Sequence, residues 1–243
     1  MINILCSDAT TKSGTFEKVD RKDGESNIDW LNARLSGDSS QAVLIMVGGR
    51  SPTDFRLRTA QAQVRSDLTP SKWSHVMLLK NPARGTASTL YEISLEPSRG
   101  FQFPTPENGI QEGKLARYGD PEKFPNIAML KVPVAQKDVN AALKRFTQQR
   151  AVLDAVDLVV RWLAYVWGVG RSGNPLLDGY GIPSAAMLEI VVGAAGFDLT
   201  PGLESRASCP EAMSQAAKYW YEYYEDQQKT ALSGFYTDPH DIK

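Results

Sequence analysis

A cysteine close to the C-terminal end of the chain has the local sequence of a catalytic nucleophile. Cys209 lies in Ser208-Cys209-Pro210-Glu211, and this spacing predicts the start of a helix, with Ser208 as N-cap and Glu211 at the third helical position. Cys209 would occupy the first helical position. Unpaired N–H groups and the helix dipole stabilise an anion there, so we expect a thiol pKa below the ordinary value of ~8.5 and a nucleophilic thiolate.

The base that would serve this nucleophile must be one of two histidines, His75 and His240. His240 lies in a polar C-terminal segment. His75 belongs to an apolar segment, residues 74–79, whose pattern predicts a strand. An isolated histidine on a strand is usually only packed, but a carboxylate partner would make His75 a general base.

Two glutamates compete to orient this histidine. Residues 74–79 and 90–95 predict two strands of an antiparallel hairpin. When His75 is placed opposite Glu92, the centre of the hairpin falls inside the predicted loop, which favours this register. Moving the centre of the hairpin by two residues places Glu96 opposite His75 on the same face. The favoured partner, Glu92, would accept a proton from one imidazole nitrogen and leave the other facing the thiol.

The elements that must position these residues predict an α+β protein. Apolar runs and turn residues predict strands at 43–47, 74–79, 90–95 and 127–132, with a short run at 101–103. Helices are predicted at about 53–67, 139–146, 151–167 and 183–195 and from Cys209 through an aromatic segment. We expect a small antiparallel sheet packed against several helices, with the cysteine at a helix N-terminus.

The chain divides by composition into three parts. Residues 1–40 are predicted to form a polar N-terminal extension that packs on the main domain, because their scattered apolar residues cannot close a core alone. Residues 41–225 are predicted to form the catalytic domain. Residues 226–243 are predicted to be a solvated polar tail.

Composition and charge exclude several classes of protein. The 243 residues are 42% hydrophobic and 23% charged, which is typical of a globular domain. Twenty-seven Lys and Arg against 28 Asp and Glu give a net charge of −1, so a nucleic-acid partner is not expected. Two cysteines supply neither a disulfide framework nor a zinc site. The expected thiol chemistry needs no metal or organic cofactor.

The N-terminal residues and the longest apolar region bear on secretion and membrane insertion. The N-terminus lacks a basic region and reaches a charge at Asp8, which is not typical of a secretory signal. Three charges interrupt the apolar region 152–169, so no stable membrane insertion is expected. We expect synthesis in the cytoplasm, and secretion by a signal-independent route stays open.

The order His, Glu, Cys resembles the circularly permuted papain-fold hydrolases related to NlpC-type cell-wall peptidases and to lecithin:retinol acyltransferase. The similar motifs are Trp73-Ser74-His75-Val76, Leu90-Tyr91-Glu92 and Cys209-Pro210-Glu211, and the resemblance spans about residues 41–225. It implies a papain-like fold in which Cys209 attacks a carbonyl carbon, His75 is base and then acid, and Glu92 orients His75. Two features depart from the family: Pro210 follows the cysteine where Ser is common, and residues 151–201 are longer and more helical.

The resemblance also implies a substrate and a biological setting. The substrate would be a peptide or isopeptide amide, as in peptidoglycan, and the chain would be an antibacterial secreted effector with an immunity or secretion partner protein. A thioesterase or acyltransferase acting on lipid-like acyl groups is one alternative, with the apolar helices of residues 152–195 lining an acyl tunnel. A catalytically silent binding module of the same fold is another.

Overall fold

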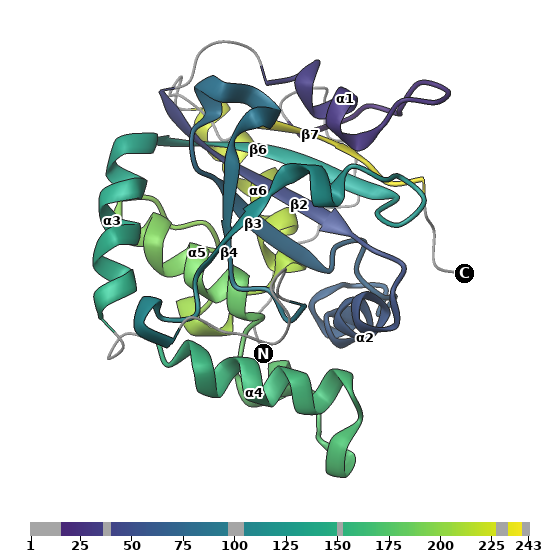
Figure 1. Cartoon of the computed structure of the whole chain (residues 1–243), viewed down its shortest axis with the longest axis vertical. Coiled ribbons are helices and arrows are strands. Elements are labelled where there is room, and N and C mark those ends of the chain that lie inside the picture. The colour runs from purple at the N-terminus through teal and green to yellow at the C-terminus, as the bar shows by residue number, and fades with distance from the viewer. Residues whose placement is uncertain (1–15, 36–39, 97–104, 150–152, 227–232, 240–243) are drawn as a thin grey trace.

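The computed structural model describes residues 16–35, 40–96, 105–149, 153–226 and 233–239. These residues form a mixed seven-stranded sheet with helices packed around it (Figure 1). The α+β prediction is confirmed, whereas the predicted sheet was smaller and wholly antiparallel.

The sheet has the order β1-β7-β6-β2-β3-β4-β5. Its strands are β1 (Phe16–Lys18), β2 (Gln41–Gly48), β3 (His75–Leu79), β4 (Thr89–Glu92), β5 (Gln111–Lys114), β6 (Asn126–Ala135) and β7 (Ser233–Thr237). Neighbouring strands are antiparallel except β1 and β7, which pair in parallel. The central strand β2 is an apolar run buried along nearly its whole length, as expected of a strand with a covered face on each side.

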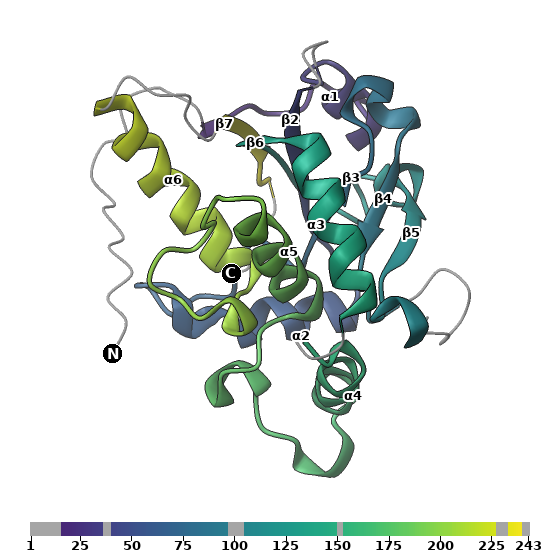
Figure 2. The same cartoon turned by 90° about the vertical axis from the view of Figure 1, so that its left-hand side faces the viewer.

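Helices and short turns complete the two outer layers. The helices are α1 (Asn27–Asn32), α2 (Pro52–Ala60), α3 (Gln136–Gln148), α4 (Ala155–Val166), α5 (Pro183–Ala194) and α6 (Pro210–Asp226). A 3₁₀ turn, η4 (Leu115–Tyr118), follows β5. Figure 2 shows α5 and α6 together on one side of the strands.

Alternation along the strands gives the sheet two separate cores. On β3, Val76 and Leu78 belong to the larger core, which also contains buried residues of α3, α5 and α6. Met77 and Leu79 belong to the smaller core, which contains buried residues of α1 and η4. Because successive side chains of a strand point to opposite faces, neighbouring positions of β3 face different environments.

The predicted extension and tail are parts of this same sheet. β7, within the predicted solvated tail, pairs with β6, and β1 from the extension pairs with β7. Trp30 and Leu31 of α1 are fully buried against the smaller core. The tail prediction is therefore wrong for β7, because a five-residue strand gains its stability from pairing with β6 rather than from its own composition. Residues 1–15 and 101–103 lie outside the described residues.

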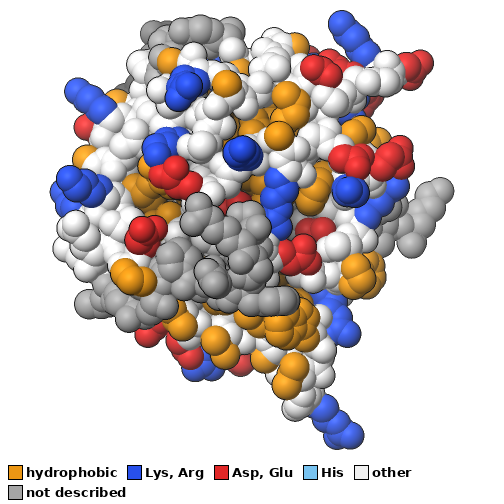
Figure 3. All heavy atoms as spheres, in the orientation of Figure 1, with side chains coloured by type: hydrophobic (Ala, Val, Ile, Leu, Met, Phe, Trp, Pro, Cys, Tyr) orange, Lys and Arg blue, Asp and Glu red, His pale blue; other side chains and the backbone are white. Residues whose placement is uncertain are grey.

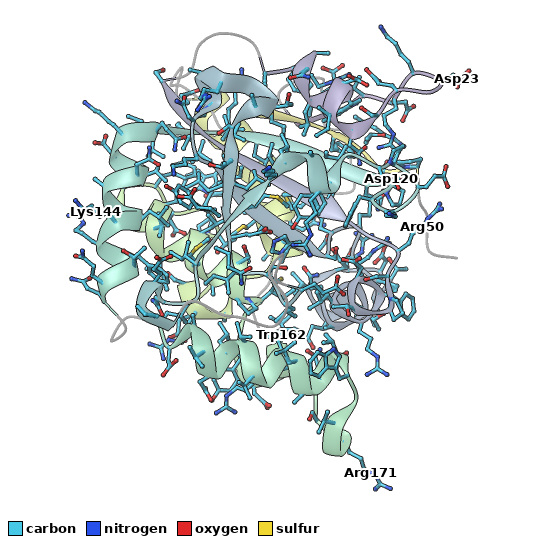
Figure 4. All side chains as sticks on the ribbon, viewed as in Figure 1. Asp23, Arg50, Asp120, Lys144, Trp162 and Arg171 are labelled. Carbon is cyan, nitrogen blue, oxygen red and sulfur yellow. The ribbon has the colours of Figure 1, made fainter. Side chains whose placement is uncertain are left out.

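One glycine fixes how the segment before α5 meets the segment before α6. The Gly181 N–H donates to the Arg206 carbonyl (2.8 Å), and the Ile182 N–H donates to the Ser208 carbonyl (3.0 Å). Trp162, which points from α4 toward the rest of the protein in Figure 4, donates its Nε1–H to the Gly181 carbonyl (2.6 Å). A Cβ on Gly181 would lie 2.3 Å from the Ser208 oxygen, so only glycine fits.

Gly181→Ala is expected to lower the free energy of unfolding by about 1–3 kcal/mol, because the added methyl forces two backbone segments apart. Gly193→Ala, in the exposed part of α5 with nothing near its Cβ, is the matched control and should raise stability by up to ~1 kcal/mol. Urea unfolding of both variants measures the difference. Equal stability of Gly181→Ala and the native chain would show that the two segments do not pack as described.

Candidate active site

The structure brings His75 and Glu92 into direct contact. The Nε2 atom of His75 lies 2.7 Å from Oε2 of Glu92, and the glutamate side chain is 1% exposed. β3 and β4 pair with Leu78 opposite Tyr91, so Glu92 is a diagonal rather than a direct cross-strand neighbour of His75. Both predicted registers are therefore wrong by two residues, in opposite directions, although the shared face is as expected.

The competing orienter, Glu96, is not part of this contact. Glu96 is exposed, and its backbone N–H donates to the Ser94 hydroxyl (3.1 Å). It lies beyond the end of β4, where the ladder no longer holds the chain beside His75. Of the two predicted carboxylates, the structure places only Glu92 against the imidazole.

A tyrosine that the sequence did not indicate completes the arrangement. The Tyr118 hydroxyl donates to the same Oε2 atom of Glu92 at 2.6 Å, and Arg117 Nη1 lies 4.0 Å from Oε1. The turn η4 supplies both residues, after β5 has paired with β4. No local pattern reveals a hydrogen bond between residues 26 positions apart, and only the pairing of β4 with β5 brings them together.

The environment of Glu92 favours its ionised form. Burial raises its pKa, but the hydrogen bond and charge of His75, followed by Tyr118 and Arg117, outweigh burial and hold the pKa of Glu92 below its ordinary value. Burial and the Glu92 charge raise the pKa of Tyr118 well above 10, so its hydroxyl stays a donor. A neutral imidazole beside this carboxylate carries its hydrogen on Nε2, which leaves Nδ1 as an acceptor.

His75 opens onto a small pocket at the end of the sheet. The cavity volume is about 40 Å³, which is enough to hold ordered water or a small polar group. Its lining comes from α2, the end of β4, η4 and the segment before α5. The polar lining residues are Thr53, Asp54, Ser94, Glu96, Arg117 and Tyr118.

Cys209 packs in the core on the opposite face of β3 from the His75 side chain. It packs in the larger core with Val76, whereas His75 projects from the face of β3 that carries Met77. The Cys209 side chain is fully buried, and it makes no hydrogen bond with His75. The structure therefore brings together two of the three predicted site residues and leaves the cysteine apart.

The predicted low pKa of the Cys209 thiol is wrong for this structure. Burial raises the pKa of the thiol to about 12, and the negative charge of Glu211 adds to this effect. The N–H groups of Ala212 and Glu211 lower the pKa, as a helix N-terminus should, but their effect is smaller. A helix start activates a thiol only where water or a cation also reaches it.

The predicted capping box is also absent. α6 begins at Pro210, which makes Cys209 the residue before the helix. The Ser208 hydroxyl lies 3.4 Å from Glu189 Oε2, and the Glu211 carboxylate accepts from Ser71 (2.6 Å) rather than from the cap. Partners from distant segments have replaced the local hydrogen bonds that the sequence predicted.

One residue contacts both the cysteine segment and the pocket. Ile182 lines the pocket with His75, and its N–H is bonded to the carbonyl of Ser208, directly before Cys209. Ile182 is itself 2% exposed. It therefore forms a wall shared by the buried thiol segment and the pocket.

Comparisons with known proteins give no family for this chain. No family model matches it, and no curated protein and no solved structure matches it significantly. Within the described residues, no group of three His, Cys, Asp or Glu side chains is placed to hold a metal ion. The face shown in Figure 3 carries basic and acidic side chains intermixed rather than a field of one sign. The assignment of the site consequently rests on its geometry.

One apolar stretch has the length and hydropathy of a membrane span. It covers Val169–Ala194, and 61% of its most apolar window is buried inside the protein. The part of it that forms α5 has 12 residues, whereas a span needs ~20. Its burial is typical of a core helix.

For the hydrolase that the sequence predicts, Glu92→Gln should weaken the hold on His75 and lower turnover by ~10–100-fold, because a neutral amide cannot stabilise the imidazolium that forms during proton transfer. Glu96→Gln, at the exposed rim of the same pocket, is the matched control and should change turnover less than twofold. Steady-state hydrolysis by both variants measures this difference. A larger loss in Glu96→Gln would transfer the orienting role to Glu96.

A second buried carboxylate predicts a pH-dependent stability. Glu189 on α5 accepts N–H bonds from Leu199 (3.0 Å) and Thr200 (3.2 Å), and burial raises its pKa to about 7. Because the folded-state pKa lies above the unfolded value of ~4.3, the unfolded chain loses this proton first, and stability falls as pH rises from about 4.5 to 7.

Glu189→Gln should therefore abolish a stability loss of ~1.4 kcal/mol per pH unit within that window. Urea unfolding at pH 5 and pH 8, compared between the variant and the native chain, isolates the contribution of this residue. The same pH slope in both proteins would show that Glu189 does not bind its proton more tightly in the folded state.

Proposed function

We propose that this chain is a cysteine hydrolase that cleaves a peptide or isopeptide amide, with Cys209 as nucleophile, His75 as base and acid, and Glu92 as the orienting carboxylate. The observation that carries the proposal is the buried Glu92 carboxylate, bonded by His75 and Tyr118 beside a pocket. Charged groups are expensive to bury, and a buried carboxylate that orients a pocket histidine is typical of a catalytic site.

The proposed reaction follows from the state of the imidazole. As the sulfur attacks the substrate carbonyl carbon, the thiol proton passes to Nδ1 of His75, and the Glu92 carboxylate stabilises the resulting imidazolium. The imidazolium then gives this proton to the departing amine, leaving a thioester. A water molecule, deprotonated by His75, attacks the thioester and releases the acid, and the proton returns to the sulfur.

The raised pKa of Cys209 affects the timing of proton transfer. With a thiol pKa of about 12, a preformed thiolate is scarce at neutral pH, so deprotonation must accompany attack. The thiol must also reach the pocket, and this requires the shared wall at Ile182 to move when substrate binds. The proposal therefore includes an opening of the segment Gly181–Ile182.

The motif order and the packing of the helices favour an amide over a lipid-like acyl group as the substrate. The motif order implies an amide of the peptidoglycan type, and with it a secreted effector with an immunity or secretion partner. The alternative of a lipid-acyl tunnel has less support, because α4 and α5 bury Val159, Trp162 and Leu188 in the larger core. These side chains do not line the pocket beside His75.

A catalytically silent binding module is the second candidate function. It is favoured by the complete burial of Cys209 and by its packing in the core on the opposite face of β3 from His75. In that case the His75 pocket would bind a ligand without cleaving it.

Cys209→Ala should reduce hydrolysis of cross-linked peptidoglycan peptides at least ~10³-fold, because no other thiol replaces the nucleophile. Cys6→Ala is the matched control and should keep full activity. A short-chain thioester assayed alongside separates amide cleavage from thioesterase activity. Full activity of Cys209→Ala on either substrate would refute the nucleophile, and binding of the peptides without cleavage by the native chain would favour the binding module.

A further inference from the structure

Two carboxylates at the pocket accept hydrogen bonds from protein side chains. Asp54 accepts from the hydroxyls of Ser51 (2.7 Å) and Ser74 (2.6 Å), one at each carboxylate oxygen. Glu92 accepts from His75 and Tyr118. Both oxygens of Asp54 and the Oε2 atom of Glu92 are therefore already engaged by the protein.

The free capacity of the pocket consists of donors. Arg117 lines the pocket, and its Nη1 atom is buried without a hydrogen-bond partner within the described residues. The other end of the guanidinium is anchored, because Nη2 donates to the backbone carbonyl of Glu96. The Thr53 hydroxyl, near the start of α2, lines the same pocket. An unpaired buried donor costs about 1–3 kcal/mol, so a ligand oxygen placed there would be bound favourably.

Arg117 is placed to bind a ligand as well as to compensate the charge of Glu92. Its Nη1 lies 4.0 Å from Glu92 Oε1, which is too long for a hydrogen bond, and both Nη1 hydrogens are available. The guanidinium also lies 5.7 Å from the Tyr118 ring centroid, which helps to fix its plane. The side chain is 29% exposed while its Nη1 atom is buried, so a ligand oxygen reaches Nη1 only when the pocket lining opens around it.

We propose that Arg117 determines substrate specificity by binding a carboxylate that lies close to the scissile carbonyl. A carboxylate matches the planar guanidinium, and the cavity of about 40 Å³ has room for such a group. Asp54 has both oxygens bonded, and Glu96 is exposed at the rim, where water and salt screen its charge. The link of Arg117 to cleavage rests on the proposed function, whereas the binding of a carboxylate by Arg117 does not depend on it.

The first experiment compares two peptides that differ only in a carboxylate or a carboxamide next to the scissile bond. For the native chain, kcat/KM should be at least ~10-fold higher for the carboxylate. In Arg117→Gln this ratio should fall to about one. Tyr118→Phe, which loosens Glu92 without removing a free pocket donor, should lower both rates and keep the ratio. An unchanged ratio in Arg117→Gln would overturn the proposal.

The second experiment measures binding without catalysis. N-acetylglycine and N-acetylglycinamide are titrated into the full chain while the imidazole NMR signals of His75 are followed. The native chain should bind the carboxylate at least ~10-fold more tightly, and Arg117→Gln should bind the two equally. Equal binding by the native chain would overturn the proposal. Selective binding without any hydrolysis would instead retain Arg117 as the carboxylate site and contradict the proposed reaction.

Discussion

The site depends on one buried carboxylate and the donors around it. Glu92 is 1% exposed, yet the hydrogen bonds of His75 and Tyr118 and the charge of Arg117 keep its pKa below the ordinary value. Removing any donor would leave part of a buried charge unpaired. The sheet meets this requirement by pairing β4 with β3 on one side and with β5 on the other, so that His75 and Tyr118 converge on one oxygen atom.

The two-faced sheet imposes the second constraint. His75 and Glu92 face the smaller core with Tyr118, while Cys209 is buried in the larger core. The pocket lies at the sheet end, where Ile93 and Ile182 from the larger core meet Tyr118 from the smaller one. A nucleophile from the larger core could reach Nδ1 only around this end, which is why Ile182 is central to the proposed mechanism.

The sequence predicted the features that depend on local periodicity. The apolar run 43–47 and the alternation around His75 predicted two strands. Because side chains alternate between the faces of a strand, His75 and Glu92 share a face in the predicted register and in any register shifted from it by two residues. The register itself depends on the connection, and the 3₁₀ turn Pro82–Ala87, with Gly85 at φ 55°, shifts it from the predicted value.

Features that depend on distant partners were beyond local patterns. The Ser208 hydroxyl contacts Glu189 instead of capping the helix. The Cys209 thiol has a raised pKa instead of the predicted low one, because it is buried in a core to which several helices contribute. Tyr118 joins Glu92 only because β5 pairs with β4. The family resemblance therefore stays a proposal. The contact of Ser208 with Glu189, the burial of Cys209 and the hydrogen bond of Tyr118 to Glu92 all affect the chemistry of the motifs, and the short motif sequences do not predict any of them.

The central claim is that Glu92 holds the His75 imidazole with its hydrogen on Nε2 and its Nδ1 turned to the pocket. Nitrogen-15 NMR of the imidazoles tests this directly, because the chain has only two histidines and His75→Gln identifies the signals. The account predicts that neutral His75 is the Nε2–H tautomer and that Glu92→Gln brings the imidazole toward a mixture of tautomers. A predominant Nδ1–H tautomer in the native chain, or a tautomer unaffected by Glu92→Gln, would contradict it.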